Sequence, residues 1–168
     1  ALDGAGDSVS VAGINGPRNT VISGPQGPLS QALEALAAAG IKTRPLRVSH
    51  AFHSALMEPM LDPFAAVAAR VTPSRPAVPL VSNVTGRVVA DELERPDYWR
   101  RHVREPVRFA DGMRSLRELG CTAFLELGPA PTLVGMGRQV LPDEAGPWLA
   151  SLRPAREDWA TLLDSLGQ

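Results

Sequence analysis

Apolar and polar positions near the start of the chain predict a pair of strands. Residues 9–14 and 20–23 alternate in polarity or are rich in β-branched side chains, and residues 15–17 between them have the composition of a turn. A period of two is typical of a strand, and a short turn joins antiparallel neighbours. We therefore expect a hairpin over residues 9–23.

The apolar spacing then changes to that of a helix. Leucines in residues 29–36 recur at intervals of four and three, and Gly40 follows them, which predicts an amphipathic helix with a glycine stop. Residues 41–48 return to a strand pattern. The order strand, strand, helix, strand matches the last four elements of a ferredoxin-like unit.

The rest of the chain predicts helices alternating with short strands, as in an α/β protein. Residues 56–71 are expected to form a helix with one apolar face, made of Leu56, Met60, Phe64, Val67 and Val71. Further strands are expected at residues 78–84, 87–89, 122–127 and 148–152, and further helices at residues 96–103, 106–119, 132–140 and 157–166.

Composition narrows the class of protein. The chain has 168 residues, of which 44% are hydrophobic and 21% charged, as in a folded domain. No apolar run is long enough to span a bilayer, and the net charge of −1 gives no reason to expect nucleic acid or a membrane as partner. The single cysteine, Cys121, excludes an intrachain disulfide framework and predicts a reducing, cytoplasmic setting.

Residues 47–59 carry the candidate chemistry. They contain His50 and His53, two of the three histidines, between a predicted strand and a predicted helix. Loops at such positions often present reactive groups, and histidine is the usual general base near neutral pH. A catalytic histidine and a pair of ordinary loop histidines are both compatible with this pattern.

A histidine base needs a nucleophile to activate. The elbow Gly-x-Ser-x-Gly does not occur, Ser49 and Ser54 are too near the histidines in sequence, and Cys121 has the setting of a small core residue. The three histidines do not have the spacing of a His-Glu-x-x-His metal site, so no metal is expected. Five arginines within residues 95–108 indicate either a local anion site or a solvated helix face.

Several motifs, taken together, resemble one family. Residues 48–59, of sequence VSHAFHSALMEP, are similar to the histidine segment of acyltransferase domains in modular type I polyketide synthases, relatives of the malonyl-CoA:acyl carrier protein transacylases. The same order of motifs continues in AGINGPR at 12–18, VISG at 21–24, VSNVTG at 81–86, YWRRHVREPVRF at 98–109 and FLELGP at 124–129. The resemblance covers nearly the whole chain. It implies an α/β-hydrolase-like acyltransferase core with part of a ferredoxin-like small subdomain.

The resemblance assigns roles to individual residues. His53 matches the family's catalytic histidine, which takes a proton from a serine and later protonates the leaving thiolate. His102 matches the position whose backbone carbonyl orients that histidine. His50, Ala51 and Phe52 match the specificity positions, where His-Ala-Phe-His usually accompanies a malonyl substrate. Phe52 would narrow the space that an α-methyl group needs.

The implied reaction moves a malonyl extender unit from coenzyme A to the phosphopantetheine thiol of an acyl carrier protein. No permanently bound cofactor is implied, because the coenzyme A thioester is a substrate. The family's serine elbow and malonyl-binding arginine are absent from this sequence. We therefore expect the C-terminal part of an acyltransferase that needs the missing N-terminal half as a partner.

The resemblance also suggests how the chain is divided. Residues 1–48 would be the end of the small subdomain, residues 49–145 the end of the acyltransferase core, and residues 146–168 a linker that packs toward a ketosynthase domain. An alternative from another class is a non-catalytic docking piece that binds the carrier protein or the ketosynthase.

Overall fold

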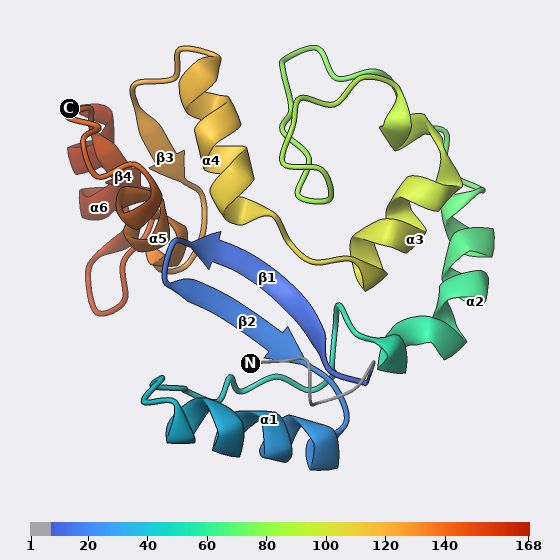
Figure 1. Cartoon of the computed structure of the whole chain (residues 1–168). Helices are drawn as coiled ribbons and strands as arrows, with labels where there is room; N and C mark the ends of the chain where they lie inside the picture. The colour runs from blue at the N-terminus through green and yellow to red at the C-terminus, as the bar shows by residue number, and fades with distance from the viewer. Residues whose placement is uncertain (1–7) are drawn as a thin grey trace.

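A hairpin occupies the middle of the molecule. The computed structural model describes residues 8–168, and its strands β1 (Ser10–Gly16) and β2 (Asn19–Ser23) pair antiparallel across a tight turn (Figure 1). This confirms the hairpin predicted from the alternating pattern. Helix α1 (Gln26–Ala38) follows, and Gly40 comes just after it with φ 74°, a conformation that glycine adopts without steric cost.

The strand predicted at residues 41–48 does not form. This segment has no regular structure, and apolar side chains along it are exposed, with Val48 at 68% exposure. A strand needs a neighbour that pairs with its backbone N–H and C=O groups, and residues 41–48 have no such neighbour in the part of the chain that the structure describes. The predicted order strand, strand, helix, strand therefore stops at α1.

The next elements are helical and lie on one side of the hairpin (Figure 1). They are the short 3₁₀ helix η1 (Ala55–Met57), α2 (Glu58–Ala68), η2 (Glu92–Glu94) and α3 (Pro96–Arg104), with α2 packed against α3. The prediction of one apolar face over residues 56–71 is largely wrong. Leu56, Val67 and Val71 are exposed, whereas Met57 and Leu61 are buried.

The strand predicted over residues 78–84 is reduced to a single bridge. Val81 and Val88 form an antiparallel bridge around a turn at Gly86, which has φ 69°. A Cβ at Gly86 would lie 2.5 Å from the Cβ of Asp111, so this turn packs directly on helix α4 (Phe109–Glu118). Residues 87–89, also predicted as a strand, contact this segment through that single bridge.

The C-terminal elements form a second group. They are α4 (Phe109–Glu118), β3 (Phe124–Glu126), α5 (Thr132–Val140), β4 (Trp148–Ala150) and α6 (Asp158–Leu166), and β3 pairs parallel with β4 (Figure 1). The rings of Phe124 and Trp148 stack at a centroid distance of 4.3 Å. The predicted strands and helices of this region are all present, although the strands are shorter and α4 begins at Phe109 instead of Pro106.

One backbone junction connects the hairpin to the rest of the fold. Val107 donates its N–H to the carbonyl of Ala12 over 2.9 Å, and Ile14 donates to the carbonyl of Val107 over 2.8 Å. These two bonds anchor the segment that directly follows α3. The buried apolar side chains come from all parts of the chain: Ala12, Ala32, Met57, Leu61, Val84, Tyr98, Ala110, Met113, Trp148 and Ala150. No helix within residues 8–168 is long and apolar enough to cross a membrane.

Candidate active site

His53 is held by the C-terminal end of α3. Its backbone N–H donates to the carbonyl of Val103 over 3.1 Å, and its Nδ1 lies 2.7 Å from the carbonyl oxygen of Glu105. The residue is half-buried. Both its main chain and its ring are therefore attached to one helix terminus that is about fifty residues away in sequence.

The bond to Glu105 determines where the imidazole proton lies. A carbonyl oxygen can only accept, so Nδ1 of His53 must carry the proton that it donates. In the neutral ring Nε2 then has a free lone pair. A base whose tautomer is set by a fixed acceptor is the arrangement that general-base catalysis requires.

The accepting carbonyl is not the predicted one. The family resemblance predicts this carbonyl at His102, but the carbonyl that His53 contacts belongs to Glu105. Helix α3 ends at Arg104, and Glu105 is extended, with φ −83° and ψ 158°, because it precedes Pro106. The carbonyl of Glu105 therefore does not point along the helix axis as the carbonyls of α3 do. Motif position alone could not reveal which residue breaks the helix.

His102 contributes its ring to an aromatic cluster. Its centroid lies 6.0 Å from that of Tyr98 and 6.3 Å from that of Trp99. Burial lowers the pKa of His102, and the charge of His53 lowers it further. The imidazole of His102 is therefore held in its neutral form next to the proposed base.

Ser54 fixes the turn that follows His53. It is fully buried, its Oγ donates to the carbonyl of Ala51 over 2.7 Å, and it accepts from the N–H of Leu56 at 3.3 Å. Serine is a favoured residue at the N-terminus of a helix because its side chain satisfies a free N–H. This capping role is not among those predicted for Ser54, although its position just before a predicted helix is a visible signal.

The predicted specificity residues lie on the loop that leads to His53. The rings of His50 and Phe52 are 5.9 Å apart between centroids and are tilted by 58°, and both residues are exposed. Nδ1 of His50 is 2.9 Å from Oγ of Ser49. Ala51 is half-buried, and its carbonyl is the acceptor for Ser54. The structure thus brings all three residues next to the candidate base.

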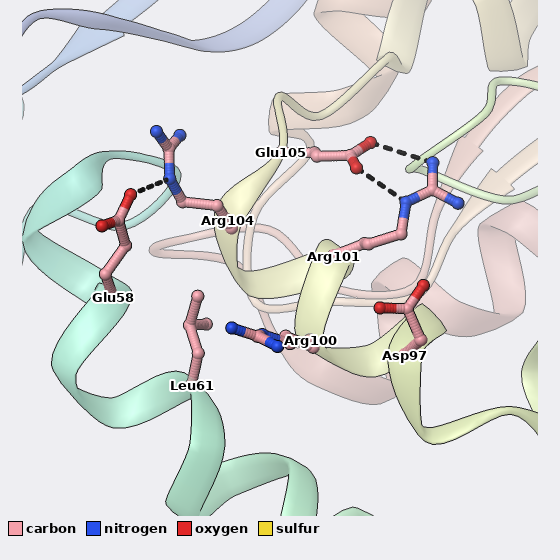
Figure 2. A pocket seen from close by; sticks show the side chains of 7 residues that line it. All are labelled: Glu58, Leu61, Asp97, Arg100, Arg101, Arg104 and Glu105. Atoms are coloured by element: carbon pink, nitrogen blue, oxygen red, sulfur yellow. Dashed lines mark hydrogen bonds and ion pairs between the residues drawn. The ribbon is translucent and has the colours of Figure 1, made fainter.

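A cleft of about 310 Å³ lies between α2 and α3 (Figure 2). Figure 2 shows Arg101 reaching Glu105 through two hydrogen bonds, and Arg104 reaching Glu58. Arg100 pairs with Asp62 at 3.2 Å. The lining residues are Glu58, Leu61, Asp97, Arg100, Arg101, Arg104 and Glu105. Because each of its arginines has a carboxylate partner, this surface is better described as a paired helix face than as an anion site.

Within the cleft, the Arg101–Glu105 pair is the best aligned. Nε of Arg101 lies 2.6 Å from one carboxylate oxygen of Glu105, and Nη2 lies 3.1 Å from the other. The hydrogen bonds to Arg101 are the main reason why the pKa of Glu105 is lowered, and those to Glu105 raise the pKa of Arg101. Two parallel bonds of this kind restrict the orientation of both side chains.

No metal-binding cluster is visible between residues 8 and 168. Nowhere in that range do three or more His, Cys, Asp or Glu side chains come together in a way that could hold an ion. Cys121 is a free, half-buried thiol.

Known polyketide synthases contain segments similar to this chain. Mycoketide-CoA synthase of Mycobacterium tuberculosis is 44% identical over 160 residues, which are 95% of this chain and 4% of the synthase. Polyketide synthase GfsA of Streptomyces halstedii is 40% identical over 163 residues, which are 95% of this chain and 2% of that protein. The chain therefore spans a small fraction of the length of these relatives.

Solved structures show the same fold. The acyltransferase domain from the second module of the salinomycin polyketide synthase matches with a TM-score of 0.93 and 47% identity, over 97% of this chain and 38% of that one. MCAT from Streptococcus pneumoniae matches with a TM-score of 0.84 and 30% identity, over 97% of this chain and 53% of that one. These matches confirm the predicted α/β acyltransferase fold. Residues 2–158 also match the family model of the acyl transferase domain, and the chain therefore belongs to this family, together with the acyltransferase domains of polyketide synthases.

Proposed function

We propose that this chain supplies the general base of a malonyl transfer from coenzyme A to the phosphopantetheine thiol of an acyl carrier protein. The observation that carries the proposal is the 2.7 Å bond from Nδ1 of His53 to the carbonyl of Glu105. It leaves Nε2 of a half-buried imidazole free to accept a proton, on a chain of the acyl transferase domain family.

The reaction needs a nucleophile in addition to this base. We assign it to a serine in the part of the domain that this chain does not span, since the chain covers 38% of the salinomycin domain. Nε2 of His53 would take the serine proton as the serine oxygen attacks the thioester carbonyl. It would then give that proton to the departing coenzyme A thiolate, which leaves a malonyl ester on the serine.

In the second half of the reaction the malonyl group moves from the serine to the carrier protein. Nε2 takes the proton of the phosphopantetheine thiol as its sulfur attacks the malonyl ester, and the serine oxygen leaves with that proton. Through both halves the Glu105 carbonyl keeps Nδ1 protonated and stabilises the imidazolium. This chain would therefore exchange one proton at one nitrogen atom.

Phe52 supports the choice of malonyl over methylmalonyl. It stands one residue before His53 on the same loop, and its ring lies against that of His50. A ring in this place would exclude an added α-methyl group. One methyl is worth about 1–3 kcal/mol, which corresponds to a preference of about 10–200-fold.

The test is to combine this chain with a segment that carries the Gly-x-Ser-x-Gly elbow. We call the product the complemented domain. Loading of a carrier protein is followed by mass spectrometry with malonyl-CoA and methylmalonyl-CoA in competition. We expect the complemented domain to load malonyl preferentially, the chain alone to load nothing, and His53→Ala to reduce loading by at least about a thousandfold.

Two outcomes would contradict the proposal. Undiminished loading by His53→Ala would remove His53 as the base. Binding of the carrier protein without any loading by the complemented domain would instead favour the non-catalytic docking role. His50→Ala is the comparison variant, because it removes an exposed imidazole from the same loop and leaves the bond to Glu105 intact. His50 is a predicted specificity position, so its removal should reduce loading less than His53→Ala does, and an equal loss would remove His53 as the base.

A further inference from the structure

Glu105 is connected to two functional groups at once. Its backbone carbonyl accepts the ring proton of His53 at 2.7 Å, while its side chain forms the two-bond ion pair with Arg101. Its own N–H also donates to the carbonyl of Arg101 over 2.7 Å. Three hydrogen bonds therefore attach Glu105 to Arg101, one turn earlier in α3.

The carbonyl of Glu105 lies beyond the regular helix, although the N–H of Glu105 still donates to the carbonyl of Arg101. Glu105 lies just beyond the last residue of α3, it is extended, and Pro106 after it has no N–H to donate. The bonds to Arg101, the bond from His53 and the junction at Val107 together restrain Glu105. The direction of the carbonyl, and through it the ring of His53, depends on those bonds.

Helix stability does not explain the pair. A carboxylate at the C-terminal end of a helix opposes the helix dipole, and an arginine that precedes a glutamate by four residues is the weaker of the two orders. The two side chains are 40% and 38% exposed, so the pair is partly screened by solvent. The specific consequence of this geometry is the orientation of Glu105.

We propose that Arg101 is a positioning residue for His53, acting through Glu105. It does not touch the reacting atoms. Its guanidinium holds the residue whose carbonyl sets the tautomer and direction of the base. The role rests on the proposed function of His53. It gives a partly exposed ion pair an effect on catalysis, beyond its small contribution to stability.

The same helix offers a matched control. Arg100 is the neighbouring residue, is exposed to a similar degree (46% against 40%), and forms an ion pair with Asp62 on α2. That pair connects α3 to α2 but does not include Glu105. Arg100→Met therefore removes an equivalent charge and ion pair without disturbing the acceptor of His53.

The experiment uses the complemented domain with ¹⁵N-labelled histidine and has two readouts. In kinetics, Arg101→Met is expected to lower kcat about tenfold, with KM changed less than about twofold, because a misaligned base affects the chemical step and not binding. In NMR, the Nδ1–H signal of His53 is expected to broaden or disappear. Arg100→Met should leave both readouts as in the unmodified domain.

A double variant tests whether Arg101 acts through Glu105. Glu105→Met keeps the backbone carbonyl but removes the carboxylate, so it should match Arg101→Met, and the combined variant should be no worse than either. If Arg101→Met fails to fold, Glu105→Gln gives the same test, with an intermediate loss of kcat expected because the amide retains one acceptor oxygen.

Two results separate the possible failures. If His53→Ala abolishes loading but Arg101→Met resembles Arg100→Met in both readouts, the positioning role is wrong and the proposed base is not. If His53→Ala loads normally, the proposed function itself fails. A rise in KM alone for Arg101→Met would also overturn the positioning role, because it would place Arg101 in substrate binding.

Discussion

At the scale of single residues, His53 combines an unfavourable backbone with a defined ring proton. Its φ of 61° lies in the left-handed region, which costs a residue other than glycine about 1–3 kcal/mol. The conformation persists because Val103, Glu105 and the buried Ser54 each hold part of the turn. Strain that the surrounding structure maintains is typical of functional sites, and here it directs the imidazole toward α3.

His102 provides a test of acid sensitivity. Its pKa is lowered in the folded protein, so the unfolded chain binds its proton more readily and the free energy of unfolding must fall as pH falls through about 6.5. This stability is fully present above that pH. We expect denaturant melts at pH 7.5 and 5.5 to show a smaller acid-induced loss for His102→Asn than for the unmodified chain. An equal loss in both proteins would contradict a neutral, half-buried His102.

At the scale of elements, the sequence predicted structures that depend on one local segment more accurately than it predicted pairing between distant strands. The helices were expected from spacing and capping residues, and the hairpin from two strands around a short turn, because each of these signals lies within one segment. The prediction of a strand at residues 41–48 was wrong, because a strand forms only where a second strand, often distant in sequence, pairs with it. The candidate site shows the same division: the motif singles out His53 as a candidate base, whereas the acceptor Glu105 depends on where Pro106 ends α3.

Glu126 illustrates a contact between elements that can be tested directly. It ends β3, and its two carboxylate oxygens accept from the N–H groups of Thr132, at 3.2 Å, and Val134, at 2.8 Å, in the first turn of α5. These N–H groups have no partner within the helix, and the negative charge suits the helix dipole. We expect Glu126→Ala to lower the free energy of unfolding by about 1–2 kcal/mol in urea melts.

The matched control for Glu126 is Glu118→Ala. Glu118 is an exposed residue at the end of α4, where a carboxylate opposes the helix dipole instead of complementing it. Its removal should leave the free energy of unfolding within about 0.5 kcal/mol of the original value. Equal effects of the two substitutions would show that Glu126 does not cap α5.

At the scale of the whole molecule, large apolar side chains are exposed on strand β3 and just after it. Leu125 in β3 and Leu127 just after it are 48% and 78% exposed, although a mostly apolar strand of an α/β sheet is usually covered. Strand β3 pairs only with β4 among the described residues. An apolar strand with one open edge readily accepts another strand. Because the chain covers 38% of the salinomycin domain, the remainder of such a domain is the expected occupant.

Hydrogen exchange can decide whether β3 receives that neighbour. We expect the amides of residues 124–127 that face the open edge to exchange rapidly in the chain alone and to become protected in the complemented domain, because new backbone hydrogen bonds would form along that edge. The amides of the β1–β2 hairpin are the internal reference, since they are already paired and should change little. Leu125→Lys places a charge on the edge strand and should weaken both the protection and the malonyl loading, without altering the hairpin. If loading is restored while the β3 amides stay unprotected, the second segment must dock elsewhere, and the exposed edge is not where the acyltransferase core is completed.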